Sequence, residues 1–68
     1  MSMQIHVNGE ARALSAGTTV ASLLAEQGLT GKRIAVERNG EIVPRSQHTS
    51  CVLDDGDRLE IVHAIGGG

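Results

Sequence analysis

Apolar and polar residues alternate over residues 3–7, which is the period of a strand with one buried face. The next two residues, Asn8 and Gly9, both tolerate positive φ and favour a two-residue hairpin turn. Residues 10–14 alternate more weakly, and we interpret them as the second strand. The pattern therefore predicts an N-terminal β-hairpin.

A short helix is predicted over residues 20–27. Three apolar residues would share one of its faces, at positions i, i+3 and i+4: Val20, Leu23 and Leu24. Thr19 is a favourable N-cap. Gly28 suits the position after the helix, where Leu29 would pack back in a Schellman-type ending. Because isolated helices of this length are marginal, we expect the apolar face to dock on a sheet.

A second hairpin is predicted after the helix. Residues 32–38 indicate a third strand, and Asn39-Gly40 repeats the turn pair. Residues 41–43 indicate a short fourth strand that ends at Pro44, since proline lacks a backbone donor. A polar connection over residues 45–51 is followed by a short apolar segment at residues 52–53. An acidic turn over residues 54–57 then leads to a last strand over residues 58–64.

This order of elements predicts an α+β fold of the β-grasp (ubiquitin-like) type. It has a mixed sheet of four to five strands with one helix packed on one face. In such a fold the last strand lies centrally and its C-terminal end leaves the sheet freely. We assign residues 1–64 to a single domain and residues 65–68 to a flexible C-terminal glycine tail.

Composition narrows the classes of function. The 68 residues include no Phe, Trp or Tyr, so the core must be aliphatic and leaves little volume for a deep ligand pocket. The net charge is −2, and the basic residues are scattered, which argues against nucleic acid as a partner. The single cysteine, Cys51, forms no internal disulfide. No leader or long apolar segment is present, so we expect a soluble cytoplasmic protein that binds no membrane.

The candidate chemical motifs are incomplete. His48 and Cys51 supply two of the four ligands that a structural zinc site needs, and Cys51 lacks a neighbouring pair that would activate it as a nucleophile. We expect a small buried thiol there. The acidic turn lacks the distal Glu of a calcium loop, so a special φ at Gly56 explains it better. We therefore expect no bound metal, no bound cofactor and no intrinsic catalytic site.

The sequence ends in three glycines, Gly66, Gly67 and Gly68. Glycine has no Cβ, so this segment fits a narrow channel. The α-carboxylate of Gly68 is ionised at neutral pH and accessible to the active site of another enzyme. Over residues 65–68 the arm reaches on the order of 13 Å when fully extended. Taken alone, the tail is equally well explained as a frayed terminus.

Together with the glycine tail, two segments resemble the ThiS family, the sulfur carrier proteins of thiamine biosynthesis: residues 39–45 (NGEIVPR) and residues 55–62 (DGDRLEIV). The similarity runs from Gln4 to Gly68. The terminal pair of glycines is shared with other ubiquitin-like carriers, whereas the Val-Pro-Arg step at residues 43–45 points to the thiamine branch. A third glycine, Gly66, is a slight departure.

The resemblance implies a protein co-substrate rather than an enzyme. An E1-like adenylating enzyme would consume ATP to adenylate the carboxylate of Gly68. Sulfur from a cysteine desulfurase or another sulfur donor would then displace AMP and leave a thiocarboxylate, which thiazole synthase would use to form the thiazole ring. Gly66 and Gly67 would carry the terminus into these active sites.

Docking on such partners requires a surface besides the tail. The candidate contact residues are Ile65, Val62, Val43 and Arg45. Adjacent strand residues point to opposite faces, so only one member of each apolar pair, Ile61-Val62 and Ile42-Val43, lies on the uncovered face. Such residues would form an apolar patch for partners. The sequence does not decide which member of each pair faces out.

Two alternatives to the thiamine carrier stay open. The small subunit of molybdopterin synthase resembles it in fold, tail and chemistry, although that family tends to be longer and to contain aromatic residues. A β-grasp interaction module with an inert tail belongs to a different class of function.

Overall fold

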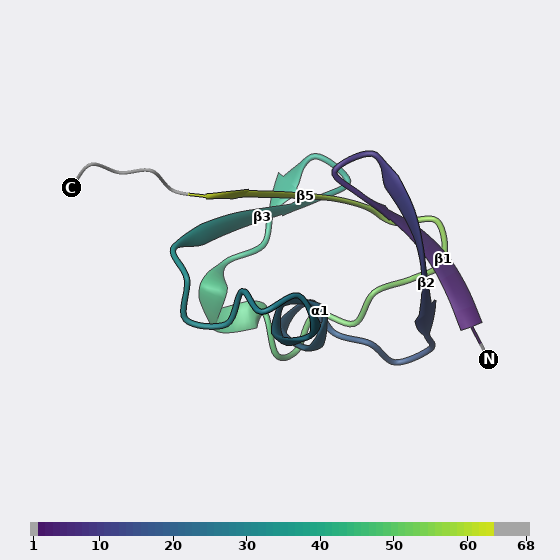
Figure 1. Cartoon of the computed structure of the whole chain (residues 1–68), viewed down its shortest axis with the longest axis horizontal. Helices are drawn as coiled ribbons and strands as arrows, with labels where there is room; N and C mark the ends of the chain where they lie inside the picture. The colour runs from purple at the N-terminus through teal and green to yellow at the C-terminus, as the bar shows by residue number, and fades with distance from the viewer. Residues whose placement is uncertain (1, 64–68) are drawn as a thin grey trace.

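The computed structural model describes residues 2–63, which form a five-stranded sheet with one helix across one face (Figure 1). The elements in chain order are β1 (Ser2–Val7), β2 (Glu10–Ser15), α1 (Val20–Glu26), β3 (Ile34–Arg38), β4 (Glu41–Ile42), the 3₁₀ turn η1 (Arg45–Gln47) and β5 (Arg58–His63). The predicted α+β class and the single helix are confirmed.

The last strand lies at the centre of the sheet, whose order is β2-β1-β5-β3-β4. β5 pairs in parallel with β1 and antiparallel with β3, so the sheet is mixed. Two hairpins flanking a central C-terminal strand, with a helix packed across them, are the β-grasp arrangement predicted from the sequence. Ala64 and the glycine tail lie outside the described residues.

Both predicted Asn-Gly turns are confirmed by their backbone geometry. Asn8 and Gly9 have φ of 51° and 86°, and Asn39 and Gly40 have φ of 52° and 87°. Positive φ at both central positions defines the type I′ turn, whose twist matches that of the flanking strands.

The helix begins and ends as predicted, within one residue. The side chain of Thr19 accepts a hydrogen bond from the backbone N–H of Ser22 at 3.1 Å, which is an N-cap. At the other end Gly28 has φ of 72°, and the N–H of Leu29 donates to the carbonyl of Leu24 at 2.8 Å. This is the Schellman ending.

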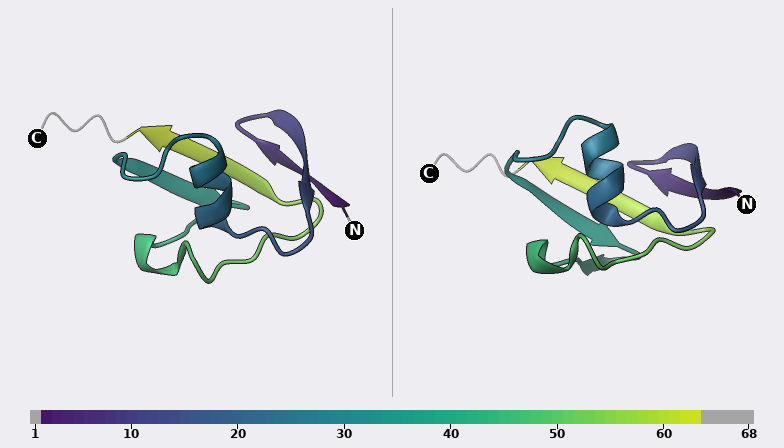
Figure 2. Two further views of the ribbon diagram at one scale, coloured as in Figure 1. Left: turned by 60° about the horizontal axis from the view of Figure 1, so that its bottom comes forward. Right: turned by 90° about the horizontal axis from the view of Figure 1, so that it is seen from below.

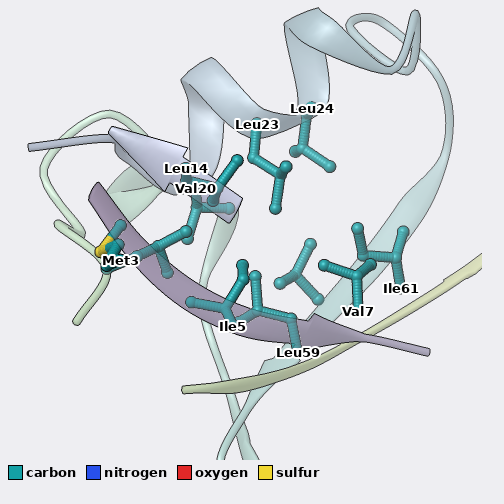
Figure 3. Packing of buried hydrophobic residues seen from close by; sticks show 11 residues of the cluster. Met3, Ile5, Val7, Leu14, Val20, Leu23, Leu24, Leu59 and Ile61 are labelled. Atoms are coloured by element: carbon teal, nitrogen blue, oxygen red, sulfur yellow. The ribbon is translucent and has the colours of Figure 1, made fainter. Parts of the chain in front are cut away.

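The core lies between α1 and one face of the sheet (Figures 2 and 3). It is aliphatic and is built from residues of β1, β2, α1, β3, β5 and the segment before β5: Met3, Ile5, Val7, Leu14, Val20, Leu23, Leu24, Val36, Leu53, Leu59 and Ile61. The three predicted helix residues are all among them. The apolar face of α1 is therefore what docks the helix on the sheet.

The strand boundaries and one connection differ from the sequence prediction. β3 begins at Ile34 rather than at residue 32, and β4 ends at Ile42 rather than at residue 43. The connection after Pro44 contains η1, in which the carbonyl of Pro44 accepts from the N–H of Gln47 at 2.9 Å. A single 3₁₀ turn has no apolar periodicity, so the pattern gives no signal for it.

Candidate functional site

The candidate site is the end of β5 together with the surface around it. Ile65, Gly66, Gly67 and Gly68, the predicted tail and carrier residues, lie outside the described residues. The structure does describe the strand that leads to them. β5 is paired on both sides along its first half, and His63 is its last residue.

The side chain of Asn8 extends the pairing of β5 beyond the end of β1. Its Oδ1 accepts a hydrogen bond from the backbone N–H of Ile61 at 2.8 Å, and its Nδ2 donates to the carbonyl of the same residue at 3.2 Å. The backbone pairing of the two strands reaches only Leu59. Asn8 therefore acts as one further rung of the ladder and fixes the strand close to its end.

A second asparagine holds the start of β5 from the other side. The Oδ1 of Asn39 accepts from the backbone N–H of Arg58 at 2.9 Å, and its Nδ2 donates to Oδ1 of Asp57 at 3.0 Å. The sequence pattern predicts both asparagines as turn residues and gives no sign of these bonds. The available signal is the use of Asn at the first position of both turns, since its amide both donates and accepts.

Asp57 is the buried centre of a polar network under the sheet. Asp57 is 6% exposed. Its Oδ2 accepts hydrogen bonds from Nε of Arg38 at 2.8 Å and from the backbone N–H of Asp54 at 2.8 Å. Arg38 also forms a 2.9 Å ion pair with Asp54. The network ties β3 to the turn before β5, so it sets the position from which β5 begins.

The environment of Asp57 favours its charged form. Burial by itself disfavours a carboxylate, but the hydrogen bonds from Asp54, Asn39 and Arg38, together with the charge of Arg38, outweigh burial and hold the pKa of Asp57 below its ordinary value. The hydrogen bond to Asp57 correspondingly raises the pKa of Arg38. Both groups are therefore ionised at neutral pH.

We predict that Asn8→Gly loosens the end of β5 without changing the fold. Glycine accepts the positive φ of this turn, so the substitution removes only the two side-chain bonds to Ile61. The expected loss is about 1–2 kcal/mol of unfolding free energy, from two part-buried hydrogen bonds. Hydrogen exchange of the Ile61 amide should become faster. Asn8→Asp keeps the acceptor and should retain protection; equal protection in Asn8→Gly would contradict the assignment.

The two apolar pairs near the site divide between the faces of the sheet. Ile61 is 7% exposed and Val62 is 52% exposed, so Val62 lies on the face that α1 leaves open. In the other pair, Ile42 is 62% exposed, whereas Val43 is half-buried and packs against the core. Ile42 rather than Val43 is therefore the exposed member of this pair, and the docking role of Val43 stays a prediction.

Arg45 does not lie beside Val62. It begins η1, which Figure 1 shows on the same side of the sheet as α1, and its guanidinium donates to the carbonyl of Lys32 at 3.2 Å. Arg45 and Val62 therefore do not belong to one docking surface. Val62 is the member of the predicted docking set that the structure places on the open face.

The two candidate zinc ligands, His48 and Cys51, each contact a different group of the protein. Nε2 of His48 lies 3.1 Å from the carbonyl oxygen of Val43, and Sγ of Cys51 lies 3.7 Å from Nη1 of Arg38. Cys51 is half-buried rather than fully buried. Gly56 has φ of 87°, so the acidic turn uses glycine as predicted. Within residues 2–63 no three His, Cys, Asp or Glu residues are grouped as a metal site.

The seven residues of α1 are too few to cross a bilayer, and residues 2–63 contain no other α-helix.

Comparison with known proteins shows a match to the model of the ThiS family over residues 5–68. The chain is 52% identical over 66 residues to a thiazole synthase of Paramagnetospirillum magneticum, covering 97% of the chain and 20% of that protein. The chain thus spans about a fifth of that relative. It is 36% identical to the sulfur carrier protein ThiS of Escherichia coli, covering 97% of the chain and 100% of that protein. A crystal structure of the thiamine biosynthesis protein ThiS from Geobacter metallireducens superposes with a TM-score of 0.84 at 29% identity, covering 97% and 100% of the two chains.

Proposed function

Because the chain belongs to the ThiS family, we propose that it is a sulfur carrier of thiamine biosynthesis and that Gly68 is the carrier residue. An E1-like adenylating enzyme would activate the carboxylate of Gly68. The sulfur would pass to thiazole synthase. In this proposal the chain is a co-substrate that binds no cofactor and acts in the cytoplasm.

The proposed chemistry consists of two acyl steps at the carboxyl carbon of Gly68. A carboxylate oxygen attacks the α-phosphorus of ATP, pyrophosphate leaves and an acyl adenylate forms. A sulfur nucleophile from a cysteine desulfurase or another donor then attacks the carboxyl carbon, and AMP leaves. When the donor is a persulfide, the product is an acyl disulfide, and a second thiol then attacks the donor cysteine sulfur, forms a disulfide with it and releases the thiocarboxylate. Gly66 and Gly67 add no side chain beside this carbon, which becomes crowded when it is tetrahedral.

The observation that carries the proposal is the placement of β5. It is the central strand, it is held by Asn8 on one side and by Asn39 on the other, and the chain runs directly from it into the glycines. A rigid strand as the base of the tail lowers the entropy lost when the tail enters an active site. The family model, which extends to Gly68, supports the same assignment.

The proposal predicts a specific covalent change that intact-mass spectrometry detects. After incubation with ATP, a thiamine-type adenylating enzyme and a sulfur donor, the chain should gain the mass difference between sulfur and oxygen. A chain that lacks Gly67 and Gly68 is the control and should stay unmodified. If only a molybdopterin-type activator produces the change, the carrier belongs to that pathway. An unchanged mass with both activators would indicate an interaction module with an inert tail.

A further inference from the structure

The face of the sheet opposite α1 carries two glutamates directly across from each other. Glu37 of β3 and Glu60 of β5 are partners in the antiparallel register, so their Cβ atoms lie about 4.5–5.5 Å apart on one face. Like charges at directly opposite positions destabilise a sheet. This arrangement therefore works against the fold and is not explained by stability.

Neither carboxylate is neutralised within the described part of the chain. Arg38, which lies on the other face, forms its ion pairs with Asp54 and Asp57. Arg58, two residues before Glu60 in β5, forms none with either glutamate. A hollow of about 400 Å³ lies between the two carboxylates and the second hairpin turn, lined by Glu37, Glu60, Arg58, Asn39 and Gly40. A long side chain from another molecule fits beside the carboxylates in such a hollow.

Exposed apolar side chains border the glutamate pair. Ile42 is the register partner of Glu37 in β4, and Val62 is opposite Ala35 on the same face. Ile42 and Val62 are two of the largest exposed apolar side chains among residues 2–63. The open-face patch, defined as Ala35, Glu37, Ile42, Glu60 and Val62, thus combines apolar area with an acidic centre. That is the composition of a docking surface for an apolar partner with a basic centre.

We propose that the open-face patch docks on thiazole synthase, at a surface where a Lys or Arg side chain inserts between Glu37 and Glu60 and apolar residues cover Val62 and Ile42. This rests on the proposed function, since the enzyme that receives Gly68 must also meet the end of β5. A protein named thiazole synthase contains a segment 52% identical to this chain. An arginine suits the position best because its planar guanidinium donates to two carboxylates at once.

A second copy of this chain fits the patch poorly. Two copies placed face to face bring two pairs of glutamates together on molecules that each carry a net charge of −2. Charge complementarity therefore favours a basic partner surface over self-association.

The test is titration calorimetry of thiazole synthase with the full chain, at low and at high salt. We expect Glu60→Lys to weaken binding at least about tenfold, with a smaller effect at high salt, because it reverses a charge that the partner neutralises. Glu26→Lys is the matched control: it makes the same charge change at the exposed end of α1, on the other side of the sheet. Binding by Glu26→Lys should equal that of the wild type.

The isosteric variant Glu37→Gln/Glu60→Gln separates docking from a structural role. It removes the repulsion, so its thermal midpoint should equal or exceed that of the wild type, while its binding should be weaker. Three results would overturn the proposal: equal binding by Glu60→Lys and Glu26→Lys, undiminished binding by the isosteric variant, or a dimer of this chain that Glu60→Lys dissociates. Intact-mass analysis of the wild type reports separately on whether Gly68 carries sulfur.

Discussion

Gly67→Val is expected to abolish adenylation of Gly68, with a fall in rate of at least about 100-fold, and to leave the fold unchanged. Valine branches at Cβ and so widens the chain next to the reacting carboxyl carbon. A displacement of about 1 Å at a reacting atom suffices for a loss of this size. The measurement is the rate of pyrophosphate release with ATP and the adenylating enzyme, at saturating ATP.

The control for this prediction is Ala11→Val, which creates the same β-branched side chain at an exposed position of β2, an edge strand of the sheet. It should be adenylated like the wild type. Both variants should keep the wild-type circular dichroism and thermal midpoint, since neither position contributes to the core described for residues 2–63. Normal adenylation of Gly67→Val would refute the steric argument for glycine at this position.

The fold was predictable because its signals are local. Asn-Gly pairs specify the two turns, Thr19 and Gly28 mark the ends of the helix, and the apolar spacing selects its buried face. Each of these features is decided within a few residues of the chain. The order of elements then leaves few topologies, and a central last strand follows from the β-grasp arrangement.

The parts that were missed depend on contacts between distant residues. Asp57 reads as one more acid of a turn, and only the folded chain brings Arg38, 19 residues earlier, to its carboxylate. The two bonds of Asn8 to Ile61 span 53 residues and leave no local pattern. Likewise, the exposed member of the pair Ile42-Val43 depends on how β4 pairs with β3. The alternation shows that the two faces differ but not which face α1 covers.

Asp57→Ala is expected to lower the unfolding free energy by about 2–3 kcal/mol. The substitution leaves Arg38, Asn39 and the backbone N–H of Asp54 without their common acceptor. Loss of one partner from a fully buried ion pair costs about 3–5 kcal/mol, and we expect less here because the Arg38 side chain is 27% exposed and keeps its pair with Asp54. In a domain of this size the midpoint of thermal unfolding should fall by roughly 10–20 °C.

The matched control is Asp54→Ala, which removes the same charge from the same network. The side chain of Asp54 is 79% exposed, and exposed ion pairs contribute little to stability, so this variant should lose at most about 1 kcal/mol. Equal losses in the two variants would show that the charge of the network, rather than the buried acceptor of Asp57, stabilises the fold.

The contribution of Asp57 to the free energy of unfolding should depend on pH, in a direction that its pKa determines. The native pKa is held below the value of about 3.9 expected in the unfolded chain, so the unfolded state binds the proton more readily. The stability that Asp57 supplies is therefore complete above about pH 4–5 and declines as the pH falls through the native pKa. Urea unfolding of the wild type and of Asp57→Ala should show a constant difference from pH 5 to pH 8, within the precision of about 0.3 kcal/mol expected of such data, and a smaller difference at about pH 3. A difference that grows on acidification would mean that the folded protein holds Asp57 protonated more strongly than the unfolded chain does, and the hydrogen bonds assigned to its carboxylate would then be wrong.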